Sequence, residues 1–246
     1  LAEVMYEEGI DPRKDTKLHT VCIGAEPHSE EQRKRIEQLL GVKAYNCFGM
    51  SEMNGPGVAF ECTEQNGLHI WEDNVIVEIV DPVTLQPVPE GEVGELVLTT
   101  INREAMPLLR YRTRDLTCIL PGDCPCGRTH KRLARFKGRS DDMIILKGVN
   151  LFPIQIEKIL MQFKELGSNY LITLETIGNS DEMLIEVELS DLFTDDYSAL
   201  QRLTKGITRQ LKDELLLTPR IKLVAKGSLP TTDGKAVRVK DHRKLC

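Results

Sequence analysis

The sequence predicts an α/β unit at its beginning, a small antiparallel β subdomain in its middle and an α+β domain at its end. The α/β unit is predicted by two strand-like segments, "TVCIGAE" and "KAYNC", which flank the helical pattern "SEEQRKRIEQLLG". The β subdomain is predicted by "NVIVEIVDP" and "GELVLTT", which are rich in β-branched residues and separated by turn residues. After residue 150, two amphipathic helical patterns alternate with strand-like segments, as in an α+β domain.

The α/β unit places a candidate site directly after its second strand. Its helix is expected to begin with a capping box formed by Ser29 and Gln32 and to end at Gly41. Parallel α/β sheets bind ligands where the carboxyl ends of their strands meet the following loops. The glycine-punctuated segment "NCFGMSEMNGPG", residues 46–57, lies at such a position.

The last domain is predicted from two apolar stripes. Pro153 opens a helix whose stripe comprises Ile156, Ile159, Leu160 and Phe163. Strands are expected near 169–177, 183–190 and 221–226, and a second helix near 196–216 buries Leu200, Leu203, Ile207, Leu211 and Leu215. We place the domain boundary close to Asp141. The predicted domains are 1–140, divided into an α/β unit 1–57 and a β subdomain of about 58–137, and 141–246.

Composition excludes several classes of protein. The 246 residues carry a net charge of −6, which argues against a nucleic-acid binder held by a basic face. No apolar run approaches the roughly 20 residues that cross a bilayer, so we expect no membrane partner. The first residue is Leu1, in a segment typical of the tail of a helix, and we expect an internal start within a longer polypeptide. Seven unevenly spaced cysteines and no secretory signal favour a reducing cytoplasm over a disulfide framework.

Four segments carry candidate chemistry, and each has a plainer alternative. In "NCFGMSE", Gly49 allows close approach of the backbone to a ligand, Phe48 offers a stacking face, and Ser51 and Glu52 offer oxygens to phosphate-bound Mg²⁺. The alternative is a polar loop after a strand. The others are "YRTRD", "GRSDDMI" and "LPTTDGKAVR", which could equally be a strand with solvated charges, a linker and a tail loop. Their order and spacing together are the specific signal.

In this order, "GAEP", "FGMSE", "YRTRD", "GRSDDMIILKGVNLFPIQIE" and "LPTTDGK" resemble the adenylate-forming enzymes, and most of all the phenylacetate-CoA ligases. The resemblance covers nearly the whole chain but only the C-terminal half to three-fifths of a complete ligase. It implies the lower part of the large domain of these enzymes, followed by a mobile C-terminal α+β domain. The N-terminal half, with its glycine- and serine-rich phosphate loop, would be a missing partner.

The resemblance implies an AMP-forming aryl-acid:CoA ligase, which uses ATP, Mg²⁺ and coenzyme A and acts on a small aryl acid such as phenylacetate. Two alternatives stay open. The acyl group could pass to another acceptor, such as a carrier protein, or the chain could be a nucleotide-binding fragment that is inactive alone. The sequence also leaves open whether the protein forms a homodimer.

The resemblance also implies a role for individual residues. Lys235 would neutralise charge during adenylation, Glu52 would hold Mg²⁺, Asp141 would be the hinge of the small domain, and Gly148 would line the CoA channel. The nucleotide-binding positions would be Gly24, Ala25, Glu26, Pro27, Asn46, Cys47, Phe48, Gly49, Met50, Ser51, Asp115 and Arg139. The first four would border the adenine, 46–50 the base and acyl pocket, Ser51 the phosphate and Asp115 the ribose.

Two positions depart from the pattern of these enzymes. The family more often has Tyr where Phe48 stands, so stacking is retained but a hydroxyl contact is lost. Arg114 in "YRTRD" stands where many relatives carry Gly, although the following Asp115 is kept.

Three cysteines and one histidine predict a separate metal site. Cys62 and His69 are seven positions apart in "ECTEQNGLH", and "CPC" contributes Cys124 and Cys126. Three thiolates and one imidazole form a closed tetrahedral set for structural Zn²⁺. The alternative is that these are packed cysteines and a surface histidine. His19, His28, His130 and His242 show no partner spacing and receive no role.

Overall fold

The computed structural model describes residues 1–53, 55–190, 197–230 and 236–243. The chain forms two compact units. The first comprises Leu1–Pro27 and Arg33–Asp141, and the second comprises His28–Gln32 and Asp142–Cys246. The grouping of the short segment 28–32 with the second unit is a feature that the sequence does not predict. Each unit has its own apolar core.

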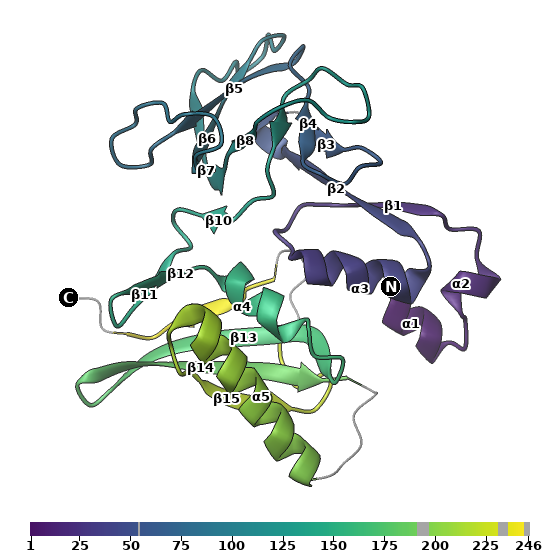
Figure 1. The fold of residues 1–246 in the computed structure, drawn as a ribbon, viewed down its shortest axis with the longest axis vertical. Helices are drawn as coiled ribbons and strands as arrows, with labels where there is room; N and C mark the ends of the chain where they lie inside the picture. Colours follow the sequence, from purple (N-terminus) through teal and green to yellow (C-terminus); the bar gives the residue numbers. More distant parts are fainter. Residues whose placement is uncertain (54, 191–196, 231–235, 244–246) are drawn as a thin grey trace. The chain divides into compact units, whose positions relative to one another are not determined.

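The α/β part of the first unit contains the predicted strand–helix–strand segment (Figure 1). Its elements are α1 (Ala2–Glu7), α2 (Pro12–Asp15), β1 (Thr20–Ile23), α3 (Glu30–Leu40) and β2 (Lys43–Met50), and β1 and β2 are parallel. The Ser29 hydroxyl caps α3 by accepting the Gln32 backbone N–H at 3.2 Å, and Gly41 follows the helix at φ 67°. A full capping box would also have the Gln32 side chain accept the Ser29 backbone N–H. This part of the prediction is wrong, because the Ser29 N–H donates to the Glu157 carboxylate at 2.9 Å.

Two sheets make up the rest of the first unit. One has six strands in the order β1-β2-β3-β4-β9-β8, and the other has four in the order β10-β7-β6-β5. Apart from β1 and β2, neighbouring strands in these sheets are antiparallel. The further elements are the 3₁₀ turn η1 (Ser51–Met53), β3 (Gly55–Glu61), β4 (Leu68–Ile70), β5 (Val75–Val80), β6 (Gly94–Thr100), β7 (Tyr111–Thr117), β8 (Ile119–Leu120), β9 (Arg132–Leu133) and β10 (Gly138–Arg139).

The core of the first unit lies where these sheets present apolar side chains to one another. The first five residues of β6, Gly94–Leu98, are all buried, and Leu96 and Leu98 are fully buried. In β5, Val75, Ile79 and Val80 are buried and Ile76 is exposed. The buried residues of this core are Met53, Val58, Ala59, Leu68, Ile70, Val75, Ile79, Leu96, Leu98 and Leu133. The segments that carry the candidate site are therefore attached to a rigid β framework.

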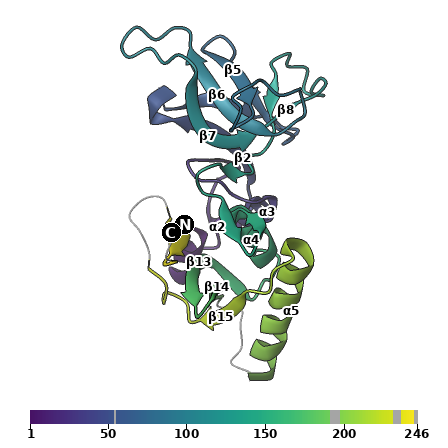
Figure 2. The same cartoon turned by 90° about the vertical axis from the view of Figure 1, so that its left-hand side faces the viewer.

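The second unit is an α+β domain with two helices on one face of a sheet (Figures 1 and 2). The sheet has the order β15-β14-β13-β16, and a separate hairpin of β11 and β12 precedes it. The elements are β11 (Ile144–Leu146), β12 (Val149–Leu151), α4 (Pro153–Leu160), β13 (Leu166–Ile177), β14 (Ser180–Leu189), α5 (Tyr197–Leu215), β15 (Arg220–Val224) and β16 (Val239–Asp241).

The predicted apolar stripes of α4 and α5 form the core of this unit. Ile156, Ile159 and Leu160 are buried, whereas Phe163 lies beyond the end of α4 and packs against the same core. On α5 the buried stripe is Leu203, Ile207, Leu211 and Leu215, and Leu200 is only partly buried. Across the described residues, no helix combines the length and the apolar character that a membrane span requires.

Candidate functional site

The prediction that a loop follows "KAYNC" is wrong, because strand β2 continues through the motif to Met50. In the antiparallel register with β3, Phe48 lies opposite the fully buried Ala59, and the regular ladder shifts directly after this pair. Residues 46–50 are therefore part of a sheet, in which Asn46 pairs with β1 and Cys47, Phe48 and Met50 pair with β3. The ring of Phe48 lies 4.4 Å from that of Phe136, tilted by 35°. Phe136 therefore occupies part of the surface that the sequence assigns to a stacked base.

Ser51 and Glu52 form the 3₁₀ turn η1 at the tip of this hairpin, and both are exposed. The Tyr111 hydroxyl lies 3.5 Å from the Glu52 carboxylate, and the Arg103 guanidinium donates to the Glu52 carbonyl oxygen. Burial and the neighbouring Glu52 carboxylate raise the pKa of Tyr111. The turn thus presents a carboxylate to solvent beside the start of the "YRTRD" strand.

The "GAEP" loop lies directly against the strand of the first motif. A Cβ atom at Gly24 would lie 2.5 Å from the carbonyl oxygen of Cys47 and 2.7 Å from its Sγ, so only glycine fits there. Ala25 follows with φ 69°, a left-handed conformation that non-glycine residues adopt rarely. The structure therefore brings Gly24 of the "GAEP" loop against Cys47 of the motif strand.

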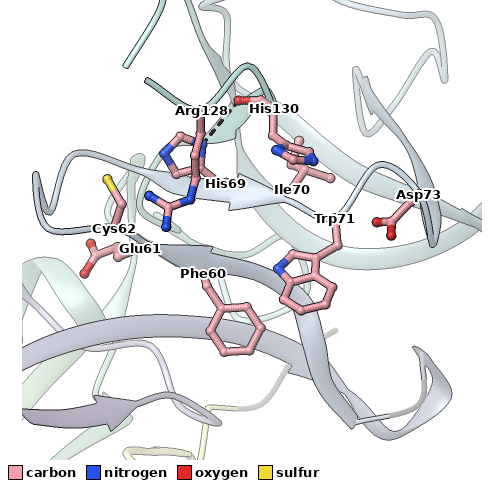
Figure 3. A pocket seen from close by; sticks show the side chains of 9 residues that line it. All are labelled: Phe60, Glu61, Cys62, His69, Ile70, Trp71, Asp73, Arg128 and His130. Atoms are coloured by element: carbon pink, nitrogen blue, oxygen red, sulfur yellow. Dashed lines mark hydrogen bonds between the residues drawn. The ribbon is translucent and has the colours of Figure 1, made fainter. Parts of the chain in front are cut away.

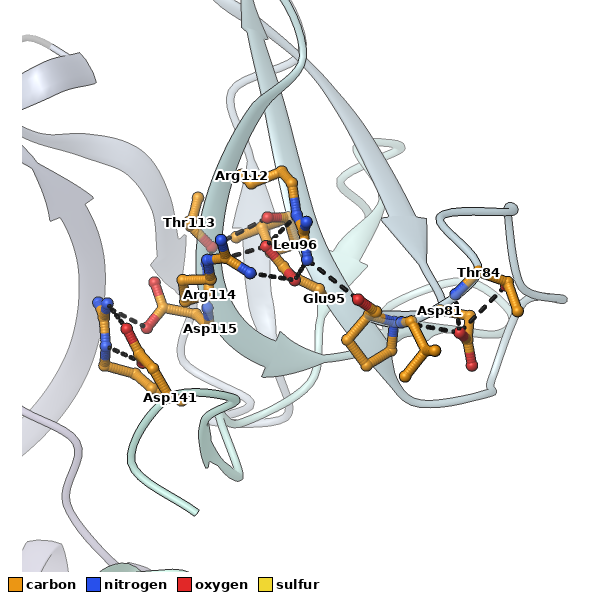
Figure 4. A network of polar contacts seen from close by, with 12 residues as sticks. Asp81, Thr84, Glu95, Leu96, Arg112, Thr113, Arg114, Asp115 and Asp141 are labelled. Atoms are coloured by element: carbon orange, nitrogen blue, oxygen red, sulfur yellow. Dashed lines mark hydrogen bonds and ion pairs between the residues drawn. The ribbon is translucent and has the colours of Figure 1, made fainter. Parts of the chain in front are cut away.

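Asp115, Arg139 and Asp141 also lie together. Arg139 of β10 is opposite Asp115 of β7 in the antiparallel register, with 4.0 Å between its guanidinium and the Asp115 carboxylate. The same guanidinium makes a bidentate pair with Asp141, with both distances at 2.9 Å (Figure 4). This pairing lowers the pKa of Asp141.

Sequence reasoning misses the buried carboxylate behind Asp115. Glu95 of β6 is fully buried and accepts two hydrogen bonds from Arg112, at 2.6 and 3.0 Å. Arg114 adopts φ 69° in a bulge of β7, where its backbone N–H donates to Glu95 at 3.3 Å and its guanidinium lies 3.8 Å away (Figure 4). A charged residue inside the apolar strand "GELVLTT" is the signal that could have revealed it.

The positive φ of residue 114 accounts for the glycine that many relatives were expected to carry at this position. Glycine adopts this conformation without steric cost, whereas an arginine does not. In this chain, the contacts of Arg114 with Glu95 support the strained backbone one residue before Asp115. Arg112 and Arg114 are therefore structural supports of strand β7, which carries the expected ribose-binding carboxylate of Asp115.

Lys235 and Gly148 are the two residues expected to act in the second unit. Lys235 lies outside the described residues. Gly148 lies in the two-residue turn between β11 and β12, with φ 81°, and Lys147 precedes it with φ 50°. Two successive positive φ values are typical of a type I′ hairpin turn. A Cβ atom at Gly148 would meet no heavy atom within 4 Å, so the turn borders open space.

The structure gathers Cys62, His69, Cys124 and Cys126 at one place. Their ligand atoms all lie within 4.8 Å of one another, although they come from the end of β3, from β4 and from the loop between β8 and β9. The Sγ atoms of Cys62 and Cys124 are 3.6 Å apart, and Cys126 Sγ is 3.4 Å from His69 Nε2. Three of the four side chains are buried.

Two neighbours that the sequence does not assign complete the surroundings of this Cys/His cluster. The other ring nitrogen of His69, Nδ1, lies 3.3 Å from the His130 carbonyl oxygen, an arrangement that orients a ligating histidine. Hydrogen bonds from Arg128 lower the pKa of the Cys126 thiol to about 6, whereas burial raises that of Cys62 to about 11. The donor set and its geometry fit a tetrahedral thiolate-rich metal.

A cavity of about 350 Å³ lies beside the Cys/His cluster (Figure 3). The rings of Phe60 and Trp71 are neighbouring walls, with centroids 5.7 Å apart, and Trp71 is 47% exposed. Cys62, His69 and Arg128 contribute polar atoms to the same lining. The cavity lies next to the expected metal ligands and shares two of them.

Comparison with known proteins identifies the family. A profile of the AMP-binding enzymes matches residues 4–102, and a profile of the AMP-binding enzyme C-terminal domain matches residues 148–243. Together the two profiles match well over half of the chain. The chain belongs to the AMP-binding enzyme family. The first match includes residues 24–27 and 46–52, and the second includes Gly148 and the segment "LPTTDGK", residues 229–235.

Individual members of the AMP-binding enzyme family match almost the whole chain. Phenylacetate-coenzyme A ligase of Thermus thermophilus is 42% identical over 99% of the chain, and that of Pseudomonas putida is 43% identical over 99%. The chain spans 58% and 55% of the length of these two relatives. A crystal structure of 2-hydroxyisobutyryl-CoA ligase in its postadenylation state, in complex with R3-HIB-AMP, matches with a TM-score of 0.90 and 32% identity. This match covers 98% of this chain and 52% of that one.

Proposed function

We propose that this chain is part of an AMP-forming ligase that joins an aryl acid, phenylacetate first, to coenzyme A. One observation carries the proposal: segments far apart in the sequence converge in the first unit. Gly24 touches Cys47, Glu52 lies beside Tyr111, and Asp115 is opposite Arg139. The phenylacetate-coenzyme A ligases at 42% and 43% identity support the choice of acid and acceptor.

The reaction has two halves with different needs. In the first, a carboxylate oxygen of the acid attacks the α-phosphorus of ATP, and the bond to the departing diphosphate breaks. In the second, the CoA thiolate attacks the acyl carbon, and AMP leaves with the electrons of the broken acyl–oxygen bond. Both steps shift negative charge, so positioned charges and hydrogen-bond donors lower their barriers.

The residues of the first unit hold the nucleotide in this proposal. The Asp115 carboxylate accepts hydrogen bonds from the ribose hydroxyls, with Arg139 beside it. Ser51 contacts the phosphates, and Glu52 is the protein ligand of phosphate-bound Mg²⁺, which neutralises phosphate charge. A single exposed carboxylate fits this ion, because Mg²⁺ keeps several waters and phosphate oxygens as ligands.

Lys235, Asp141 and Gly148 serve the alternation between the two halves. Lys235 neutralises charge on the reacting groups during adenylation and is withdrawn when CoA attacks. Rotation about Asp141 achieves this exchange, and the hairpin turn at Gly148 then lines the path of the CoA thiol. The proposed domains are accordingly 1–140 and 141–246.

The Cys/His cluster holds a structural Zn²⁺ ion in this proposal. Its four ligand atoms lie within 4.8 Å of one another, and no other group of three or more such side chains occurs within the described ranges. Zinc bound by three thiolates and one imidazole keeps no position open for substrate, so it stabilises the fold. Metal analysis of the complete enzyme should find one zinc per chain; protein purified without chelators that lacks zinc would refute this part.

A cytoplasmic location is part of the same proposal. The six cysteines that the structure describes are free, and three of them belong to the Cys/His cluster, whose thiolates need a reducing compartment.

The ligase activity is tested with a panel of acids and acceptors. The complete enzyme is given ATP and Mg²⁺ with phenylacetate, benzoate, acetate or no acid, and with CoA or a carrier protein. We expect AMP release that requires both an aryl acid and CoA. AMP release with a carrier protein but not with CoA would replace the proposed acceptor, and no turnover of any acid would refute the function.

A further inference from the structure

Half of strand β2 lacks a neighbouring strand on one side. The pairing of β2 with β3 begins at Cys47↔Phe60, and β3 ends at Glu61. Ala44 and Asn46 pair with β1 on the other edge, but β3 turns away before it reaches them. The backbone groups of Ala44 and Asn46 on this side therefore need other partners, because buried backbone groups are costly when unpaired.

Three side chains take the place of the missing strand. The Glu61 carboxylate accepts the Asn46 backbone N–H at 2.7 Å, and the Glu37 carboxylate accepts that of Ala44 at 3.0 Å. The side-chain amide of Gln65 donates to the Ala44 carbonyl at 2.9 Å and to Glu37 at 3.0 Å. These bonds hold the strand directly before the nucleotide motif.

Two of these side chains belong to the segment that forms the Cys/His cluster. Glu61 immediately precedes Cys62, and the Gln65 backbone N–H donates to the Cys62 carbonyl at 3.0 Å. Arg132, which is 4% exposed, donates to the Asn66 carbonyl and to carbonyls just before Cys124. The loop that carries Gln65 is thus fixed by the same segments that supply the thiols.

We propose that Glu61 and Gln65, together with Glu37, are positioning residues that couple the Cys/His cluster to the strand bearing the nucleotide motif. The coupling rests on the proposed function, in which the cluster holds zinc and residues 46–52 contact the nucleotide. Metal binding fixes the loop, the loop fixes Glu61 and Gln65, and these fix the backbone of β2. Loss of the metal then loosens the nucleotide site although none of the four metal ligands is one of the proposed nucleotide-binding residues.

The hydrogen bonds are tested by amide hydrogen exchange in the complete enzyme. Gln65→Met keeps the size of the side chain but removes the hydrogen bonds of its amide to the Ala44 carbonyl and to Glu37, which accepts the Ala44 N–H. Because this acceptor is then held less firmly, exchange at Ala44 should quicken by about tenfold. Glu61→Leu should have the same effect at Asn46, whereas Glu61→Gln, which still offers an acceptor, should restore slow exchange. Gln86→Met, at an exposed position of the same unit, is the matched control.

The coupling is tested by removing the metal and measuring AMP binding. Chelation that removes zinc should quicken exchange at Ala44 and Asn46 and raise the Kd for AMP by about three- to tenfold. In Gln65→Met, chelation should cause little further increase in exchange at Ala44, because the hydrogen bonds from Gln65 to Glu37 and to the Ala44 carbonyl are already absent. These readouts do not depend on turnover, so an enzyme inactive toward every acid would fail the proposed function but not this test.

Three results would overturn the coupling. Zinc could leave without any change in exchange at Ala44 and Asn46. Exchange could quicken equally throughout β5 and β6, which would indicate general loosening of the first unit. Protein without any zinc would remove the coupling together with the metal role, while AMP release would still decide the ligase assignment.

Discussion

Glu95 shows how a single residue supports the expected ribose site from behind. Its carboxylate is fully buried, and Arg112 and Arg114 face it from β7. Breaking a buried ion pair is costly, because removal of one partner leaves the charge of the other unpaired in a partly buried position. The bulge at Arg114 depends on these contacts, and the bulge in turn places Asp115.

Glu95→Ala should therefore destabilise the first unit by about 3 kcal/mol, since Arg112 loses both hydrogen bonds of its bidentate pair. Chemical denaturation of the chain measures the free energy of unfolding. The matched control is Glu78→Ala, whose partner Arg110 is 60% exposed, and it should cost less than about 1 kcal/mol. Equal losses for the two variants would contradict the supporting role of Glu95.

Gly24 allows the "GAEP" loop to contact the motif strand. Gly24→Ala should place a methyl group against the Cys47 carbonyl and push the loop away, which costs about 1–3 kcal/mol of stability and weakens AMP binding. Gly57→Ala is the control, because a Cβ atom there meets nothing within 4 Å. Thermal unfolding and AMP titration measure the stability and the AMP affinity of both variants. A Gly24→Ala protein with unchanged stability and AMP affinity would refute the close approach of Gly24 to Cys47.

At the scale of the elements, the Glu37 carboxylate joins α3 to β2. Burial alone would raise the pKa of Glu37, but hydrogen bonds from Ala44 and Gln65 and the charge of Arg33 together lower it below 4.5. A folded-state pKa below the unfolded value means that this group stabilises the fold above about pH 4.5. That stability is lost as the pH falls through the lowered pKa.

Glu37→Gln removes this titration, so the variant should lose less stability than the wild type between about pH 5 and pH 3. Urea unfolding at several pH values gives the comparison for the full chain. The difference in unfolding free energy between the two proteins should shrink as the pH falls. A difference that stays constant with pH would show that Glu37 is not held as a carboxylate by its neighbours.

The elements that the sequence predicts well are those with a strong internal period. The apolar stripes of α4 and α5 and the β-branched strands β5 and β6 lie close to their expected positions. The hairpin of β2 and β3 is not predicted, since "CFGMSEMNGPG" has turn-like composition and its strand character depends on pairing. The three side chains that complete the edge of β2 are likewise invisible to local patterns, because they come from distant segments.

At the scale of the whole molecule, the order of the motifs predicted more of the site than any one motif did. "NCFGMSE" alone was compatible with an ordinary loop, whereas its combination with "YRTRD" and "GRSDDMI" pointed to one nucleotide site. The first unit contains "NCFGMSE", "YRTRD" and residues 138–141 of the third segment. The Cys/His cluster was predicted from donor chemistry, but its neighbours Arg128 and His130 could not be, because only folding brings them there.

Lys235 lies outside the described residues, so its role remains a prediction of the sequence. In the complete enzyme, Lys235→Ala should abolish formation of the acyl-adenylate, because the repulsion between the acid and the triphosphate is no longer offset. Attack of CoA on preformed acyl-adenylate should be largely spared. Rapid-quench assays of the two half-reactions separate these effects, and an equal loss in both would refute the assigned role.

The central claim is that the nucleotide site activates an acid by adenylation, and one exchange measurement tests it most directly. The complete enzyme is incubated with ATP, Mg²⁺, phenylacetate and labelled diphosphate in the absence of CoA. Reversible acyl-adenylate formation predicts transfer of label into ATP that depends on phenylacetate. Exchange that is absent, or that is the same without the acid, would contradict the claim.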